Sequence, residues 1–152
     1  RWDLRGGRRA IGVPTSIAEE YPVNLDALIP KHKSDTEAAR RARTAGYPVI
    51  QPILGDLLTW MQDMNWPVAS EIEAALQPVG APLSPHILKV LQGGDDVWKY
   101  WVLTRIAVNF DREARAPIMD ECLRIVNNPT DGEIAEEVNL AARDILLLNA
   151  HD

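Results

Sequence analysis

A chain of 152 residues with 46% hydrophobic and 25% charged residues has the length and composition of one soluble globular domain. No run of about 18 apolar residues is present, which excludes a membrane-spanning helix, and the single cysteine, Cys122, excludes an intramolecular disulfide. The formal net charge of -6 disfavours nucleic acid as a partner, because phosphates require clustered Lys and Arg.

The charge is unevenly distributed along the chain, which begins with a basic segment. Residues 1–45 hold nine Lys or Arg and six Asp or Glu, a net charge of +3, whereas residues 46–152 carry a net charge of -9. Residues 1–24 lack the apolar core of a signal peptide, and we treat them as an N-terminal extension of undefined role. The remainder, residues 25–152, is predicted to form one helical-repeat domain, and the lone cysteine favours a reducing, cytoplasmic location.

The first pair of predicted helices lies near residues 35–62. The first of them begins at "SDTE", where Ser34 and Glu37 have the spacing of a capping box, and it ends near Gly46. The second follows Pro48, because proline is well tolerated in the first turn of a helix. Its buried stripe is predicted to hold Ile50, Ile53, Leu57 and Met61.

The stretch "LLTWMQDMNWPVA", residues 57–69, joins this pair to the next. Asp63 to Asn65 are predicted to form the turn, with Trp60 and Trp66 on either side of it. Large rings of this kind fill the irregular gap between helices, so Trp66 is expected to be largely buried between consecutive pairs. The alternative is an aromatic cage for a ligand, which would need an exposed cavity.

The second pair of helices is predicted near residues 66–92, and it repeats the first pair at an offset of 34 residues. The third pair is predicted near residues 95–127, where the repeat recurs without its glycine and at an offset of 35. Each copy has proline, an apolar residue, three variable positions, two apolar residues, two variable positions and a further apolar residue. In the third copy these are Pro117, Ile118, Cys122, Leu123 and Val126.

The last predicted helix runs from near Gly132 to Asn149, with apolar residues at alternating spacings of four and three. The glutamates at its start, Glu133, Glu136 and Glu137, are predicted to form a solvated first turn, where acidic residues are favoured by the helix dipole. The chain is therefore predicted to be all-α, with six or seven main helices. Three helical pairs plus a closing helix indicate a short α-α superhelix, a HEAT-like α-solenoid, and a globular bundle is the competing architecture.

Three stretches of this sequence together resemble a known protein family. They are "WMQDMNWPVA" (60–69), "DDVWKYWVL" (95–103) and "IVNNPTDGEIAEEVNLAARDIL" (125–146). The family they resemble is a bacterial one of HEAT-like helical proteins catalogued as a domain of unknown function, and the resemblance covers Leu25 to Leu148. It implies a short α-α superhelix and brings no catalytic residues. Some relatives are similar to immunity proteins that neutralise bacterial toxins, which suggests that role by analogy.

The acidic body favours a protein-binding, non-enzymatic module whose partner is a basic protein. Carboxylates that avoid the apolar stripe of their own helix are the candidates for this contact: Glu71, Glu73, Asp95, Asp96, Asp120 and Glu121. If they form the interface, reversing Asp95 and Asp96 to Lys slows association more than it destabilises the fold. If they are helix caps, the opposite ranking is expected.

The alternative function is a small-ligand-binding or enzymatic domain that uses a rim of residues at the inter-helix turns. That rim is predicted to hold Asp63, Trp66, Asp95 and Lys99. Paired carboxylates could bind a cation or act as acid and base, although Asp at helix starts more simply acts as a cap. The three histidines are far apart and there is one cysteine, so we expect no metal site and no cofactor. The oligomeric state is not predicted.

Overall fold

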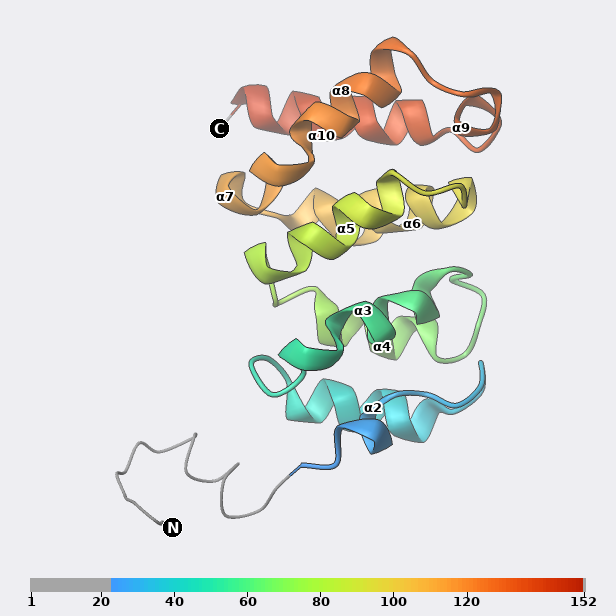
Figure 1. Ribbon diagram of the computed structural model, residues 1–152, viewed down its shortest axis with the longest axis vertical. Coiled ribbons are helices and arrows are strands. Elements are labelled where there is room, and N and C mark those ends of the chain that lie inside the picture. Colours follow the sequence, from blue (N-terminus) through green and yellow to red (C-terminus); the bar gives the residue numbers. More distant parts are fainter. Residues whose placement is uncertain (1–22, 152) are drawn as a thin grey trace.

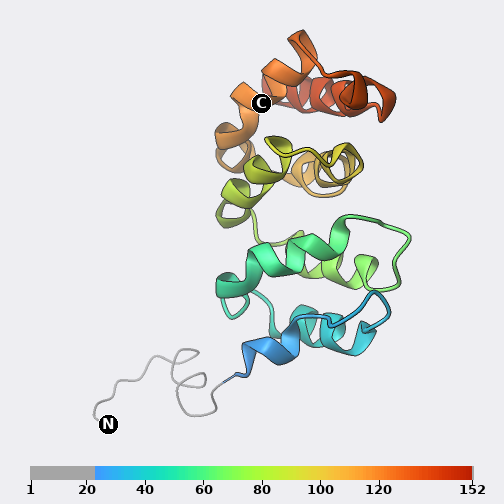
Figure 2. The ribbon, with the colours of Figure 1, turned by 45° about the vertical axis from the view of Figure 1, so that its right-hand side comes forward.

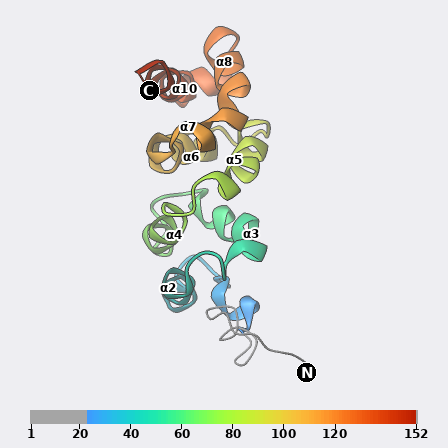
Figure 3. The ribbon, with the colours of Figure 1, turned by 90° about the vertical axis from the view of Figure 1, so that its left-hand side faces the viewer.

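The computed structural model describes residues 23–151, which form a stack of helices with no β-strand in that range. Figure 1 shows the helices following one another along the long axis of the molecule. The view turned by 90° separates them into two layers (Figure 3). One layer holds α2 (Thr36–Ala45), α4 (Ala69–Leu76), α6 (Asp96–Arg105) and α10 (Val138–His151). The other holds α3 (Leu54–Leu58), α5 (Ser84–Leu91) and α8 (Met119–Asn127).

The predicted order of helical pairs is confirmed. Helix α2 is followed by α3, α4 by α5 and α6 by α8, and the pairs are stacked in sequence order, with α10 closing the stack (Figure 2). Helix α10 packs against both α6 and α8, so the last pair is covered by the closing helix. Shorter elements complete the chain: α7 (Arg112–Arg115), α9 (Asp131–Ala135), η1 (Leu25–Leu28), η2 (Gln51–Ile53), η3 (Thr59–Met61), η4 (Ala81–Leu83), η5 (Ala107–Asn109) and η6 (Ala116–Ile118).

One apolar core runs through the stack, because each pair buries its hydrophobic side against its neighbours. The predicted stripe of Ile50, Ile53, Leu57 and Met61 is buried. The predicted core position of Cys122 is also confirmed, and burial raises the pKa of its thiol to about 12. Leu123, which the repeat aligns with core positions, is instead 48% exposed, because the buried face of α8 runs through Cys122 and Ile125.

The helices of the second layer share an opening turn. Each begins with a 3-10 turn that contains a proline, and an α-helix then follows. In the first copy this proline is Pro52, so the prediction that Pro48 fills the role is wrong. Pro48 lies in the preceding turn, after a cis Tyr47–Pro48 peptide bond. The first copy therefore begins its helix a few residues later than the other copies do.

Two glycines make the equivalent reversals from the first layer to the second. Gly46 follows α2 with φ 67° and Gly80 follows α4 with φ 76°. This left-handed conformation is cheap for glycine and costly for other residues. A Cβ placed on Gly80 would meet no atom within 4 Å, so the requirement there is conformational and not steric.

Three predicted helix boundaries are wrong. The N-cap of α2 is Asp35, not Ser34, because the Asp35 carboxylate accepts a hydrogen bond from Ala38 N at 3.3 Å. Helix α4 begins at Ala69 and not at the Trp66–Pro67 pair. The predicted closing helix is two helices, α9 and α10, because the chain turns at Glu137, whose φ is 61°.

Trp66 is partly exposed, but most of the residue is covered and it packs against the core, in line with the predicted packing role. Its ring lies 5.7 Å from that of Trp60, centroid to centroid, and both rings pack against the core. The segment that carries Trp66 is the turn before α4, which lies at an edge of the stack and not between its layers (Figure 1). The pair thus fills the joint between helices, as expected, while leaving part of each ring in solvent.

Candidate functional site

Three connecting segments lie along the same edge of the stack, on the right in Figure 1: residues 62–68, 92–95 and 128–137. We call this the turn edge. Three of the four predicted rim residues belong to it, Asp63, Trp66 and Asp95, and the two aspartates have local structural roles. Asp63 accepts a hydrogen bond from Asn65 N at 2.8 Å, and Asp95 caps α6 by accepting one from Trp98 N at 3.0 Å.

Lys99, the fourth predicted rim residue, is not on an exposed rim. Its side chain is 5% exposed, and its ammonium forms ion pairs with Glu133 at 2.9 Å and Asp96 at 3.0 Å. Burial opposes the charge on Lys99, but the two carboxylates outweigh burial and raise the pKa of its ammonium. The predicted rim of four residues is therefore divided between the surface and the interior.

Glu133 lies at the centre of a buried ion network. Its side chain is 0% exposed, so the prediction that it belongs to a solvated first turn is wrong. Besides Lys99, the guanidinium of Arg124 donates to both carboxylate oxygens, at 3.0 and 2.6 Å. Glu133 also completes a capping box with Thr130 at the start of α9. Burial opposes its ionisation, but these hydrogen bonds dominate and lower the pKa of Glu133 to about 2.

This network joins three helices, since Lys99 belongs to α6, Arg124 to α8 and Glu133 to α9. The helices approach so closely that a Cβ on Gly132 would overlap the carboxylate of Asp96. The network therefore fixes α9, and the turn that follows α9, in one position relative to α6.

A hollow of about 320 Å³ lies between α6 and the turn from α9 to α10. We call it the α6–α9 hollow. It is lined by Val97, Tyr100, Trp101, Ala135, Glu136 and Glu137. The two aromatic rings stand 5.2 Å apart, centroid to centroid, at an interplanar angle of 73°. Glu137 also lines the hollow, and its left-handed backbone conformation is costly for a residue with a Cβ.

The charges of the hollow are not compensated within the described part of the chain. Glu136 and Glu137 are both exposed, and neither has an ion-pair partner among residues 23–151. Aromatic faces and carboxylates both attract cations. The hollow therefore has the chemistry of a site for a positively charged group.

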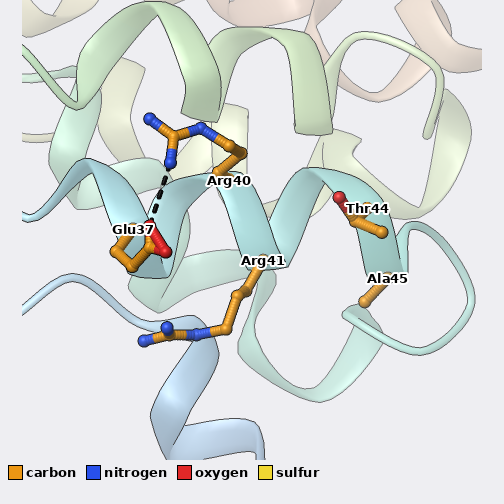
Figure 4. A pocket seen from close by; sticks show the side chains of 5 residues that line it. All are labelled: Glu37, Arg40, Arg41, Thr44 and Ala45. Carbon is orange, nitrogen blue, oxygen red and sulfur yellow. Dashed lines mark hydrogen bonds and ion pairs between the residues drawn. The ribbon is translucent and has the colours of Figure 1, made fainter.

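A second hollow, of about 340 Å³, lies on one helix, α2. Figure 4 shows Arg40 and Arg41 pointing to opposite sides of that helix. Arg40 forms an ion pair with Glu37 at 2.9 Å, and Arg41 donates to the carbonyl of Ala27 at 3.1 Å. Because these two guanidinium groups already have partners within the chain, the α6–α9 hollow is the stronger candidate.

The predicted partner-binding carboxylates mostly have partners of their own. Glu71 pairs with Arg43 at 3.1 Å, and Glu73 lies 3.7 Å from Arg105. Asp96 pairs with Lys99, Glu121 pairs with Arg124 at 2.9 Å, and Asp95 is a helix cap. Asp120 alone of the six is exposed without an ion pair or a capping bond among residues 23–151.

Sequence reasoning missed the hollow, although its residues were in view. The "WKYW" stretch and the glutamate run both stood out, but they are more than thirty residues apart, and neither pattern indicates that the other is near. The signal that comes nearest to joining them is the repeat period, because the N-caps Asp95 and Thr130 lie 35 residues apart in sequence.

Two further observations restrict the chemistry of the described residues. Within residues 23–151, no group of three or more His, Cys, Asp or Glu is arranged to hold a metal ion. In the same range, no helix combines the length and the apolar character needed to cross a bilayer.

Comparison with known proteins gives one family. No curated protein matched the chain. A family model described as "Domain of unknown function (DUF5071)" matches residues 28–146, which include every helix from α2 to α9 and most of α10. The chain therefore belongs to the DUF5071 family of domains of unknown function.

Proposed function

We propose that this protein is a non-catalytic binding module that recognises a basic segment of another protein at its turn edge. In this proposal the helices form a HEAT-like solenoid, whose stacked turns present one continuous surface to a partner. A bacterial, cytoplasmic immunity protein that neutralises a basic toxin is its most concrete form. The proposal concerns the class of partner, and the immunity role rests on the family resemblance of the three sequence stretches.

One observation carries the proposal: the α6–α9 hollow pairs two uncompensated carboxylates with two aromatic rings. Most of the acidic residues that the sequence predicts to bind a partner already form ion pairs with a Lys or Arg of this chain. Glu136 and Glu137 keep their charge available and stand beside Tyr100 and Trp101. Such a site is expected to bind a cationic group of a partner molecule.

The charge of the whole chain supports the same class of partner. Residues 46–152 carry a net charge of -9, and a surface of one sign speeds the approach of a partner of the opposite sign. Long-range attraction would set the rate of association, and the hollow would supply a short-range contact that slows dissociation.

The competing hypothesis of a small-ligand-binding or enzymatic rim has weaker support. Lys99 is held in the interior by two carboxylates, and Asp63 and Asp95 are engaged with backbone amides. None of the four rim residues lines either of the two hollows. A catalytic acid or base needs freedom to exchange a proton with a substrate, and these groups are committed to the fold.

The experiment uses a fluorescent octapeptide of alternating arginine and lysine, with binding followed by anisotropy at about 50 mM and about 300 mM salt. The double variant Glu136→Gln/Glu137→Gln is expected to weaken binding about tenfold or more at low salt, which corresponds to about 1.4 kcal/mol. The matched control is Glu113→Gln/Asp144→Asn, which removes the same charge from exposed positions outside the hollow. The control should weaken binding less than about twofold. Equal losses in both variants would reduce the effect to net charge and contradict the proposal.

A further inference from the structure

The shape of the α6–α9 hollow restricts which cation can enter. A volume of about 320 Å³ is at the lower end of the range for ligand pockets, so it suits one side chain and not an extended cofactor. The Tyr100 and Trp101 rings meet edge to face, and both residues line the hollow. Val97 and Ala135 add apolar surface to the lining of the hollow.

The protein already pairs one of these rings with a guanidinium. The Cζ atom of Arg105 lies 5.5 Å from the centroid of the Trp101 ring, within the range of a cation–π contact. Arg105 is one helical turn beyond Trp101 and does not line the hollow, so this contact leaves the hollow open. The electron-rich ring system of Trp101 is thus placed where guanidinium groups pack against it.

Arginine and lysine differ in ways that matter in such a site. A guanidinium is planar and weakly hydrated, and it presents five N–H donors, so it can lie flat on an aromatic wall while donating to two carboxylates. An ammonium is compact and strongly hydrated, and it loses more hydration when it enters a hollow with apolar walls. A hollow lined by both aromatic rings and two carboxylates therefore favours arginine.

We infer that the α6–α9 hollow binds the guanidinium of a single arginine side chain from a partner protein and selects it over the ammonium of lysine. The inference rests on the proposed function and names the residue that the partner contributes. The guanidinium packs against the rings of Tyr100 and Trp101 and donates to the carboxylates of Glu136 and Glu137. The methylene groups of the arginine lie against the apolar surface of Ala135.

The test is an NMR titration of the whole ¹⁵N-labelled protein, observed at the indole N–H groups of its five tryptophans. The Trp101 resonance is assigned with Trp101→Phe. The indole nitrogen of Trp101 is buried without a hydrogen-bond partner, so its resonance reports on the ring that lines the hollow. The probes are N-acetyl-argininamide, N-acetyl-lysinamide and the uncharged isostere N-acetyl-citrullinamide.

We expect argininamide to shift the Trp101 resonance to saturation with an affinity at least about fivefold higher than that of lysinamide, and citrullinamide to have no saturable effect. Glu136→Gln/Glu137→Gln should abolish the saturable shift. A second variant, Ala135→Leu, should also abolish it, because a larger side chain on this exposed residue fills the hollow and changes no charge. A folded protein is verified in each case by the unchanged resonances of the other tryptophans.

The outcomes separate this inference from the proposed function. Equal affinity for argininamide and lysinamide, or a saturable shift that survives Ala135→Leu, would overturn the arginine assignment. Absence of any shift at Trp101 in the unaltered protein would also overturn it. In each of these cases the proposed function would still stand if the unaltered protein binds the alternating arginine–lysine octapeptide at the turn edge. If the unaltered protein does not bind the octapeptide, the proposed function itself is wrong.

Discussion

Glu133 holds three helices with one carboxylate. It accepts hydrogen bonds from Lys99 of α6 at 2.9 Å and from Arg124 of α8 at 2.6 and 3.0 Å, while it caps α9 through Thr130. Removing one member of a buried ion network leaves the other members charged and unpaired, which costs far more than loss of an exposed pair. The position of the α6–α9 hollow therefore depends on a residue that does not line it.

Glu133 should make the unfolding free energy depend on pH in the acidic range. The pKa of Glu133 is about 2 in the folded protein and 4.5 for an ordinary glutamate. Because the folded pKa is the lower one, the contribution is complete above about pH 4.5 and is lost as the pH falls towards about 2. The contribution amounts to about 3 kcal/mol from the size of the shift. Urea unfolding at about pH 7 and about pH 3 measures the part lost between these two values, about 2 kcal/mol.

The control for this prediction is Glu133→Gln, which keeps the size of the side chain and has no carboxylate to titrate. Its unfolding free energy should be lower near neutral pH and should fall less on acidification than that of the unaltered protein. Identical acid dependence in the two proteins would mean that other carboxylates, and not Glu133, control acid unfolding.

Asp95 has a more local role. Its carboxylate accepts a hydrogen bond from Trp98 N, so the structure favours the cap over the interface expected from sequence. Asp95→Ala should lower the unfolding free energy by about 1 kcal/mol, and Asp95→Asn, which retains a capping oxygen, by less. Both should leave octapeptide affinity within about twofold of the unaltered protein, because Asp95 does not line the α6–α9 hollow. A large loss of affinity with unchanged urea unfolding would restore the interface role.

At the scale of elements, the break between α9 and α10 distinguishes the end of this stack from its middle. Glu137 adopts φ 61° at that break, and it is the one non-glycine residue with positive φ among residues 23–151. The reversals after α2 and α4 use Gly46 and Gly80 for the same purpose. A glutamate in place of glycine costs stability, and it brings a carboxylate to the wall of the hollow.

Replacing Glu137 separates conformational cost from charge. Glu137→Gly should make the protein more stable than Glu137→Ala by about 1 kcal/mol, because glycine adopts the left-handed conformation without strain. Both variants lose the same carboxylate, so both should bind the octapeptide equally weakly. Urea unfolding and anisotropy measure the two quantities. If the alanine variant were as stable as the glycine variant, strain at this turn would be ruled out.

At the scale of the whole molecule, the sequence predicts the stack well because its signals are local. The apolar period from Ile50 to Met61 and the prolines that open α5 and α8 depend on neighbours along the chain. The break at Glu137 was not predicted, because neither glycine nor proline marks it. The burial of Glu133 was not predicted either, because its partners Lys99 and Arg124 come from other helices.

The same distinction between local patterns and contacts of distant helices explains why the sequence did not predict the candidate site. Helical periodicity predicts which acidic residues are exposed. It does not predict which of their carboxylates form ion pairs with Lys or Arg of the same chain. Pairing of Glu71 with Arg43 crosses from α4 to α2, so only the packed structure reveals it. Glu136 and Glu137 became candidates because the packing leaves them uncompensated beside Tyr100 and Trp101.

The central claim is that the two walls of the α6–α9 hollow act as one site for a cation from a partner. A double-mutant cycle tests it, with octapeptide affinity measured for the unaltered protein, Glu137→Gln, Trp101→Leu and the double variant. If one bound cation contacts both residues, the double variant should bind the octapeptide little worse than whichever single variant binds it more weakly. The coupling free energy between the two substitutions should then be about 1 kcal/mol or more. Losses that add to within about 0.5 kcal/mol would show that the two residues act independently and would contradict the account.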